Sequence, residues 1–321
     1  MKQTGLPSSP LIAVVGATAT GKSALALKLA QAFDGEIISA DSRQVYRYMD
    51  IGTAKPTAAE RAQVRHWLID VVAPNEEFSL GRYLDLAQEA LRDVWSRGKT
   101  AFLVGGTGQY VWSLLEGWQV PRVGPDWGLR RSLEERARRE GAGVLHRELA
   151  AVDPEAAARI DPRNVRRVVR ALEVYRLTGR PLSSWQEKLQ PEFAALILGL
   201  DLPRSELYRR IDERVEHMLA AGLVDEVRGL LARGYGPTLP PLSGIGYRQV
   251  CQYLAGELSL AEATEKMKTE THRLARMQST WFRRDDQRMH WLAADGDVYA
   301  EAERLVGASL RSASNMTRRE K

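Results

Sequence analysis

Short apolar runs alternate along the chain with longer stretches in which apolar positions recur every three or four residues. The short runs predict strands; they lie at residues 11–15, 35–39, 67–72, 100–104 and 194–200, and we expect a last strand at 289–292. The longer stretches predict helices, among them 24–32, a pair within 205–233 and a long helix at 260–284. Strands that alternate with helices predict a parallel sheet covered on both faces.

This alternation stops between residues 121 and 193, where helix signals dominate and the density of charge rises. Two Asp-Pro pairs in this region, at 153–154 and 161–162, are typical of helix starts. We therefore expect a helical insertion. The predicted boundaries are a first core part at 1–120, the insertion at 121–193, a second core part at 194–306 and a polar, basic, disordered tail at 307–321.

A glycine-rich loop follows the first predicted strand. Residues 16–23 read GATATGKS between that strand and a helix, which is the context in which this pattern binds phosphate. Its backbone N–H groups and the positive end of the helix point at the anion. The less favoured alternative is an ordinary turn that binds no ligand. The pattern predicts an α/β fold with a P-loop NTPase-like parallel sheet, flanking helices and the insertion. The predicted diphosphate ligands are Gly16, Ala17, Thr18, Ala19, Thr20, Gly21, Lys22 and Ser23, with Ser23 also reaching Mg2+.

Two further loops follow strands of the same sheet. Asp41 comes after the second strand, where a carboxylate can take a proton from a nucleophile; an Asp that only forms a turn or caps a helix is the alternative. The strand at 100–104 runs into residues 105–110, GGTGQY, without the acidic residue that holds Mg2+ in ATPases and GTPases. Thr107 in that loop either contacts a ligand or simply caps the next helix. These features favour group transfer over a motor or a switch.

Composition places the chain among ordinary globular proteins. It has 321 residues, of which 44% are hydrophobic and 27% charged, enough for one large or two smaller domains. No apolar run approaches the roughly 18 residues of a membrane span, and the first residues lack the order of a signal peptide. We expect a cytoplasmic protein without a membrane partner. Its one cysteine, Cys251, excludes an internal disulfide framework.

Positive charge is concentrated in the insertion. The net charge of +5 is modest for this length, but arginines cluster in two predicted helices. The apolar positions of the second helix follow a helical repeat, so its arginines occupy the opposite flank. Two interpretations remain open: a packed helix with a solvated basic face, or a track for a phosphate backbone. The clusters are Arg130, Arg131, Arg136, Arg138 and Arg139, and then Arg163, Arg166, Arg167 and Arg170.

The motifs together resemble those of the tRNA dimethylallyltransferases. After the phosphate loop come DSRQVY at 41–46, MDIGTAKP at 49–56 and GGTG at 105–108, and the order continues through RALEV at 170–174, GYRQ at 246–249 and TWFR at 280–283. The resemblance covers about residues 11–292, and the segment 41–56 is its most diagnostic part. Two positions depart from it: Ser243-Gly244 stands where family members often have Gln-Ala, and Arg276-Met277-Gln278 replaces a more usual Lys-Arg-Gln.

The resemblance implies transfer of a dimethylallyl group from dimethylallyl diphosphate to the N6 amine of the adenosine just 3′ of the tRNA anticodon. It implies Lys22 and Mg2+ on the departing diphosphate, Asp41 as the base and Thr107 orienting the amine or binding diphosphate. Arg248 contacts the diphosphate or the tRNA. The insertion clasps the anticodon stem, and we expect a monomer. The implied tRNA contacts are Asp41, Ser42, Arg43, Gln44, Thr107, Arg130, Arg166, Arg167, Val168, Val169, Arg170, Ser243, Gly244, Ile245, Gly246, Tyr247 and Arg248.

Two rival classes stay open. A small-molecule or nucleotide kinase uses the same phosphate loop with an acceptor-side Asp41, but needs an ATP site and arginines that close on the γ-phosphate. The other is a non-catalytic RNA-binding protein with a vestigial loop. Against it, Lys22, Ser23, Asp41 and Thr107 are all present, which a decayed site would not require. Four tryptophans are expected in the core rather than as base-stacking platforms: Trp127, Trp185, Trp281 and Trp291.

Overall fold

The computed structural model describes residues 9–185, 188–294 and 296–319. Within it the chain forms two compact units. The first unit consists of Met1–Phe78, Tyr83–Leu115 and Pro191–Lys321, and the second of Ser79–Arg82 and Glu116–Gln190. The larger segment of the second unit, Glu116–Gln190, thus begins a few residues before the insertion boundary expected at 121 and ends before the one expected at 193, and the unit also takes in Ser79–Arg82, which was not expected.

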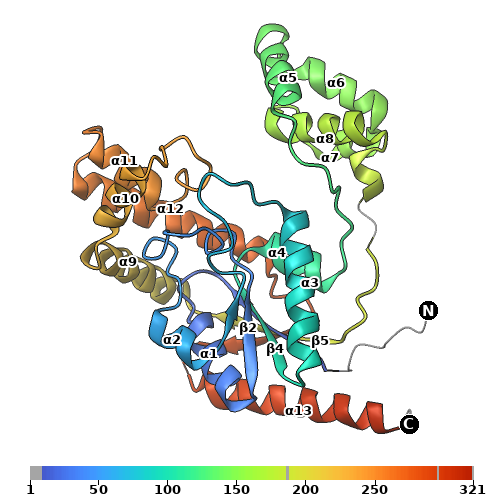
Figure 1. The fold of residues 1–321 in the computed structure, drawn as a ribbon, viewed down its shortest axis with the longest axis vertical. Helices are drawn as coiled ribbons and strands as arrows, with labels where there is room; N and C mark the ends of the chain where they lie inside the picture. The colour runs from blue at the N-terminus through green and yellow to red at the C-terminus, as the bar shows by residue number, and fades with distance from the viewer. Residues whose placement is uncertain (1–8, 186–187, 295, 320–321) are drawn as a thin grey trace. The chain divides into compact units, whose positions relative to one another are not determined.

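A six-stranded sheet forms the centre of the first unit (Figure 1). Every pairing in it is parallel, and the strand order is β3-β2-β4-β1-β5-β6. Because all strands run the same way, the loops that follow β1, β2 and β4 meet at one edge. The strands are β1 Leu11–Gly16, β2 Gly35–Ser39, β3 His66–Trp67, β4 Thr100–Gly105, β5 Ala195–Asp201 and β6 Met289–Ala293.

The predicted third strand is much shorter than expected. The apolar run 67–72 suggested a strand throughout, but β3 ends at Trp67. Leu68 and Asp70 adopt left-handed backbone conformations, with φ of 62° and 58°, which a strand cannot accommodate. The chain resumes parallel pairing only at an isolated bridge between Tyr46 and Val72.

One face of the sheet packs against α1 (Lys22–Ala32) and α13 (Val298–Arg319). Strand residues such as Ile12, Val14 and Leu198 meet Leu29 of α1 in this core. The prediction of a disordered tail at 307–321 was wrong for residues 307–319, where α13 continues, and residues 320–321 lie outside the described residues. Ala302 and Val306 of α13 are fully buried, and the apolar stripe they begin carries the helix beyond 307.

Of the remaining helices of the first unit, α9 to α12 form a second core around the segment that follows β2. Val45 and Met49 of that segment pack with Leu223, Val250 and Met267. This packing fixes the loop after β2 against helices that lie far away in the sequence. The helices are α2 Ala58–Gln63, α3 Leu80–Ser96, α4 Gly108–Leu115, α9 Arg204–Ala220, α10 Leu223–Ala232, α11 Tyr247–Leu254 and α12 Leu260–Trp281.

The second unit has a small helical core of its own, in which Leu133, Leu149 and Leu172 are buried. Asp153 caps α7 by accepting from the N–H of Ala156, as its Asp-Pro pair predicted. The second Asp-Pro pair does not start a helix directly, since Asn164 caps α8. The elements are α5 Trp127–Glu140, α6 Ala142–Val152, α7 Pro154–Arg159, α8 Val165–Thr178 and a short 3-10 helix at Leu182–Trp185.

Over the described residues, no helix combines the length and the low polarity that crossing a bilayer requires.

Candidate active site

A cavity of about 520 Å³ opens where β1, β2 and β4 end. Lys22 and Ser23 line it from the phosphate loop, Asp41 from the loop after β2, and Thr107 from the loop after β4. The structure therefore brings together the residues that the sequence predicted for the chemistry, at the edge of the sheet where α/β proteins bind their ligands.

The phosphate loop has the backbone that its sequence predicted. β1 ends at Gly16 and α1 begins at Lys22, and the loop between them contains Ala19 with a φ of 63°. The Thr20 hydroxyl donates to the carbonyl of Ala17 at 2.9 Å, and the Lys22 ammonium donates to the same carbonyl. Gly21 at the start of α1 supplies no side-chain cap, so the first N–H groups of this helix remain available for an anion.

Two of the cations that line the cavity, Lys22 and Arg214, are desolvated and lie near the Asp41 carboxylate. Burial, reinforced by the neighbouring Arg214, lowers the pKa of Lys22 to about 7, while Asp41 opposes this shift. Burial also lowers the pKa of Arg214, again opposed by Asp41. A site that places two desolvated cations together is matched to a ligand that carries more than one negative charge.

The sequence alone did not single out Arg214. It lies on α9, a helix that also carries Arg204, Arg209 and Arg210, and nothing local distinguishes one arginine from the others. Its position between the buried Ile211 and Val215 is the only signal, because it places Arg214 beside the apolar face rather than opposite it.

Asp41 forms a turn and also lines the cavity, so the two interpretations left open for it are compatible. Its Oδ1 accepts from the N–H of Arg43 at 2.8 Å and from that of Gln44 at 3.4 Å, an arrangement common for Asp in turns. The Thr107 hydroxyl accepts from the N–H of Ser42 at 3.0 Å. The carboxylate and the hydroxyl are therefore held on adjoining loops.

Gln278 of α12 joins the phosphate loop to the loop after β4. Its Oε1 accepts from the N–H of Thr18 at 2.8 Å, and its Nε2 donates to the carbonyl of Gly106 at 3.0 Å. A Cβ on Gly106 would lie 2.4 Å from that Nε2, so only glycine allows this approach. Gln278 stood out in the sequence only as part of the departure at 276–278, not as a site residue.

The loop before α11 lines the opposite wall, with Gly244, Ile245, Gly246 and Tyr247 at the cavity. Ser243 is exposed beside it and donates to the carbonyl of Pro240 at 2.7 Å, the same carbonyl that Arg43 binds at 3.0 Å. Arg248 is not among the lining residues and pairs with Glu270. Arg248 therefore lies away from the cavity lining, whereas Arg214 belongs to it, and the diphosphate role of Arg248 stays a prediction.

The predicted tRNA-binding residues of the second unit fall into two groups. Arg130 and Arg170 both bind Glu173, whose side chain is fully buried, at 2.8 and 2.5 Å. Val168 and Val169 are 0% and 2% exposed within the core of the unit, so their side chains cannot reach RNA. Arg166 and Arg167 are exposed.

Two of the four tryptophans expected in the core are exposed. The side chain of Trp127 is 53% exposed in the second unit, and that of Trp281 is 41% exposed in the first. Trp281 also lines the cavity and contacts Gly108 closely, with a Cβ there falling 2.2 Å from its ring. Trp127 and Trp281 therefore do not lie in a core, and the expectation that they pack against protein rather than stack on bases stays a prediction.

Comparison with known proteins places this site in a family. The family model described as IPP transferase matches residues 44–285. The tRNA dimethylallyltransferase of Roseiflexus castenholzii is 54% identical over 92% of this chain and 97% of that protein. The one of Chloroflexus aurantiacus is 56% identical over 85% of this chain and 93% of that protein.

Solved structures agree with this assignment. The tRNA isopentenylpyrophosphate transferase of Bacillus halodurans is 38% identical, covers 97% of this chain and 99% of its own, and superposes with a TM-score of 0.70. A eukaryotic dimethylallyltransferase, described as acting on tRNA, is 29% identical over 89% of this chain and 74% of its own, with a TM-score of 0.77. The family model matches well over half of the chain, and relatives that are more than half identical match nearly all of their own length, so the chain belongs to the IPP transferase family, that of the tRNA dimethylallyltransferases.

Proposed function

We propose that this protein transfers the dimethylallyl group of dimethylallyl diphosphate to the N6 amine of the adenosine 3′-adjacent to the anticodon of tRNA. The carbon–oxygen bond to the diphosphate breaks, a carbon–nitrogen bond to N6 forms, and the N6 proton leaves to a base. The observation that carries this proposal is the cavity in which Lys22 and Arg214 share space with Asp41 and Thr107.

The diphosphate end is assigned to the phosphate loop. The N–H groups of residues 16–23, the Lys22 ammonium and the Arg214 guanidinium stabilise the negative charge that grows on the departing diphosphate. The Ser23 hydroxyl lines the cavity at the first turn of α1. One protein hydroxyl together with phosphate oxygens and water suits Mg2+, so we assign Ser23 as its ligand. Bound Mg2+ supplies further neutralisation of the diphosphate charge.

The acceptor end is assigned to Asp41 and Thr107. The N6 lone pair of adenine is delocalised into the ring, so the amine gains nucleophilicity only as its proton is removed. The turn around Asp41 uses Oδ1, which leaves Oδ2 to accept the N6 proton. Thr107, tied to Ser42 at 3.0 Å, orients the amine. The allylic diphosphate ionises readily because the developing cation is delocalised. The pocket must therefore also exclude water, which would otherwise react with that carbon.

The adenine must leave the anticodon stack to reach this cavity, as bases do in other enzymes that modify them. In the second unit, the exposed Arg166 and Arg167 supply charge for the phosphate backbone. Arg130 and Arg170 act indirectly, by holding α5 and α8 together through Glu173. We expect the enzyme to act as a monomer.

Incubation with dimethylallyl diphosphate and unmodified tRNA tests this function. Mass spectrometry of the tRNA nucleosides should show N6-dimethylallyladenosine, mass spectrometry of ribonuclease fragments should place it after the anticodon, and diphosphate should be released. The rival kinase activity is tested in parallel with ATP and candidate acceptors. Consumption of ATP with no change in the tRNA nucleosides would replace the proposed function with a phosphoryl transfer.

A further inference from the structure

The turn formed by residues 49–56, which we call the acceptor wall, contributes Gly52, Thr53, Ala54 and Pro56 to the lining of the cavity. It belongs to the segment that follows Asp41 and carries no regular secondary structure over most of its length. A wall made of irregular backbone holds its shape only through what anchors it.

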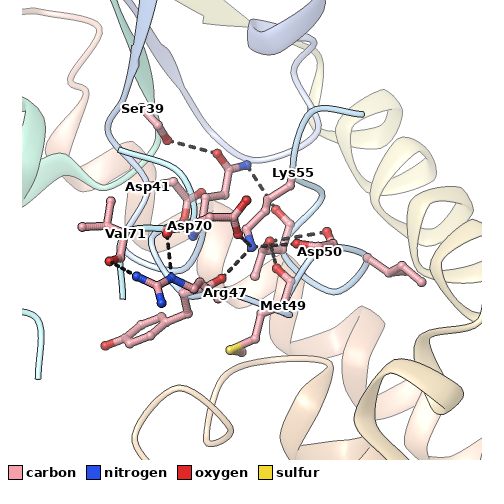
Figure 2. Close-up of polar contacts among 12 residues, drawn as sticks. Ser39, Asp41, Arg47, Met49, Asp50, Lys55, Asp70 and Val71 are labelled. Carbon is pink, nitrogen blue, oxygen red and sulfur yellow. Dashed lines mark hydrogen bonds and ion pairs between the residues drawn. The ribbon is translucent and has the colours of Figure 1, made fainter. Parts of the chain in front are cut away.

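Lys55 anchors the wall from within (Figure 2). Lys55 is only 8% exposed. Its ammonium donates to the carbonyl of Tyr46 at 2.5 Å, to Asp50 at 2.7 Å and to Asp70 at 2.6 Å. All three donors of the ammonium are thus satisfied. Asp50 belongs to the wall, whereas Asp70 belongs to the chain beyond β3, so Lys55 ties two separate segments.

Glu226 of α10 anchors the same turn from outside. One carboxylate oxygen accepts from the N–H groups of Asp50 at 2.9 Å and Ile51 at 2.7 Å. The other accepts from the N–H of Gly52 at 3.2 Å and from the Tyr247 hydroxyl at 2.7 Å. Gly52 is required here because its Cβ would lie 2.6 Å from the Tyr247 ring. Three successive amides therefore bind one side chain.

Gln44 connects the anchored wall to the Asp41 turn. Its Nε2 donates to the carbonyls of Thr53 at 3.3 Å and Ala54 at 3.2 Å, and its Oε1 accepts from the Ser39 hydroxyl at 3.0 Å. Its own N–H donates to Asp41. A continuous set of hydrogen bonds thus runs from Lys55 and Glu226, through the wall, to the carboxylate assigned as the base.

We propose that Lys55 and Glu226 are positioning residues that set the place of the Asp41 carboxylate through the acceptor wall. This inference rests on the proposed function. Neither side chain lines the cavity, so both act through other groups. Loss of Lys55 leaves Asp50 without its cation and Asp70 with Arg61 alone, and loss of the Glu226 charge weakens four hydrogen bonds at once.

The test compares Lys55→Met and Glu226→Gln with Arg97→Met. Arg97 pairs with Glu36, which is 6% exposed, at 2.5 Å, and neither residue lines the cavity, so Arg97→Met controls for the loss of a partly buried ion pair. Hydrogen exchange at residues 50–54 reports the wall. Steady-state kinetics with dimethylallyl diphosphate and tRNA report the reaction.

We expect exchange at residues 50–54 to become at least tenfold faster in both variants and kcat to fall at least tenfold. The KM for dimethylallyl diphosphate should stay within twofold of the wild-type value, because the phosphate loop is not attached to the wall. Arg97→Met should change neither exchange nor kcat. If a variant does not fold, Asp70→Asn, which removes one charge from the Lys55 cluster, takes its place with smaller effects in the same direction.

Three results would overturn the inference: unchanged exchange, faster exchange with wild-type kcat, or a KM for dimethylallyl diphosphate that rises as much as kcat falls. The last result would mean general damage to the site. The wild-type protein is assayed first, so absence of transfer there overturns the proposed function and is told apart from failure of the anchors.

Discussion

The Oε1 atom of Gln278 accepts a hydrogen bond from the N–H of Thr18 at 2.8 Å, and the same side chain binds the loop that carries Thr107. One carboxamide from α12 therefore spans the two loops to which the proposed reaction assigns its leaving group and its nucleophile. β1 and β4, from which the two loops emerge, are neighbours in the sheet, and this side chain adds a direct link between the loops themselves.

Gln278→Ala should lower kcat/KM by about tenfold to a hundredfold for both substrates, since a small misplacement of reacting groups is costly. Steady-state kinetics with each substrate varied in turn checks this. Arg276→Ala is the matched control, because Arg276 lies on the same helix but binds the Tyr208 hydroxyl. An effect confined to tRNA would show that Gln278 does not influence the phosphate loop.

Asp41→Asn should abolish transfer while tRNA affinity stays within about tenfold of wild type. The amide keeps an oxygen for the N–H of Arg43 and so preserves the turn, but it cannot take a proton at neutral pH. Single-turnover assays and a binding titration measure the two properties. Asp34→Asn, which removes the charge of an exposed Asp paired with Lys99, should leave both unchanged. Weak binding with normal turnover of bound tRNA would contradict the assignment of Asp41 as the base.

Binding of dimethylallyl diphosphate should take up a proton above neutral pH. In the free protein burial lowers the pKa of Lys22 from 10.5 to about 7, so the amine is largely neutral at pH 8 to 9. A polyanion favours the charged form and raises this pKa. Affinity should therefore be greatest below pH 7 and fall by about tenfold for each pH unit above it.

Calorimetry in buffers with different ionisation enthalpies measures this proton uptake. Lys22→Arg is the control, because its guanidinium stays charged and leaves only the pH dependence of the substrate itself. Equal proton uptake by the variant and the wild type would assign the titration to another group.

Arg166→Ala combined with Arg167→Ala should weaken tRNA binding and reduce the slope of log K against log salt by about 1.5 to 2. Both arginines are exposed near the start of α8. Binding titrations at several salt concentrations measure the slope. Arg163→Ala is the matched control, because Arg163 already pairs with Asp161 at 2.7 Å. An unchanged slope in the double variant would remove these residues from the interface.

Local patterns in the sequence were enough to predict much of the active edge. The phosphate loop, the strand before it and the helix after it are consecutive, so one apolar run and eight residues specify the whole unit. Asp41 and Thr107 each follow a strand of a parallel sheet, and parallel strands bring such loops to one edge. Their common edge therefore follows from strand periodicity, whereas their meeting in one cavity also needs the order β2-β4-β1, which only the structure shows.

Other features depend on contacts between distant parts of the chain. Arg214, Gln278 and Glu226 come from three different helices, and helical periodicity identifies the face that a side chain occupies but not what that face meets. Asp70, one of the two left-handed residues after β3, binds Lys55, a contact that the apolar run 67–72 does not reveal. Arg170 and Arg166 belong to the same basic cluster, but Arg170 pairs with the buried Glu173, whereas Arg166 is exposed to solvent. Motifs made of neighbouring residues can therefore be predicted from the sequence, whereas the partner of a charged side chain depends on which distant elements pack against it.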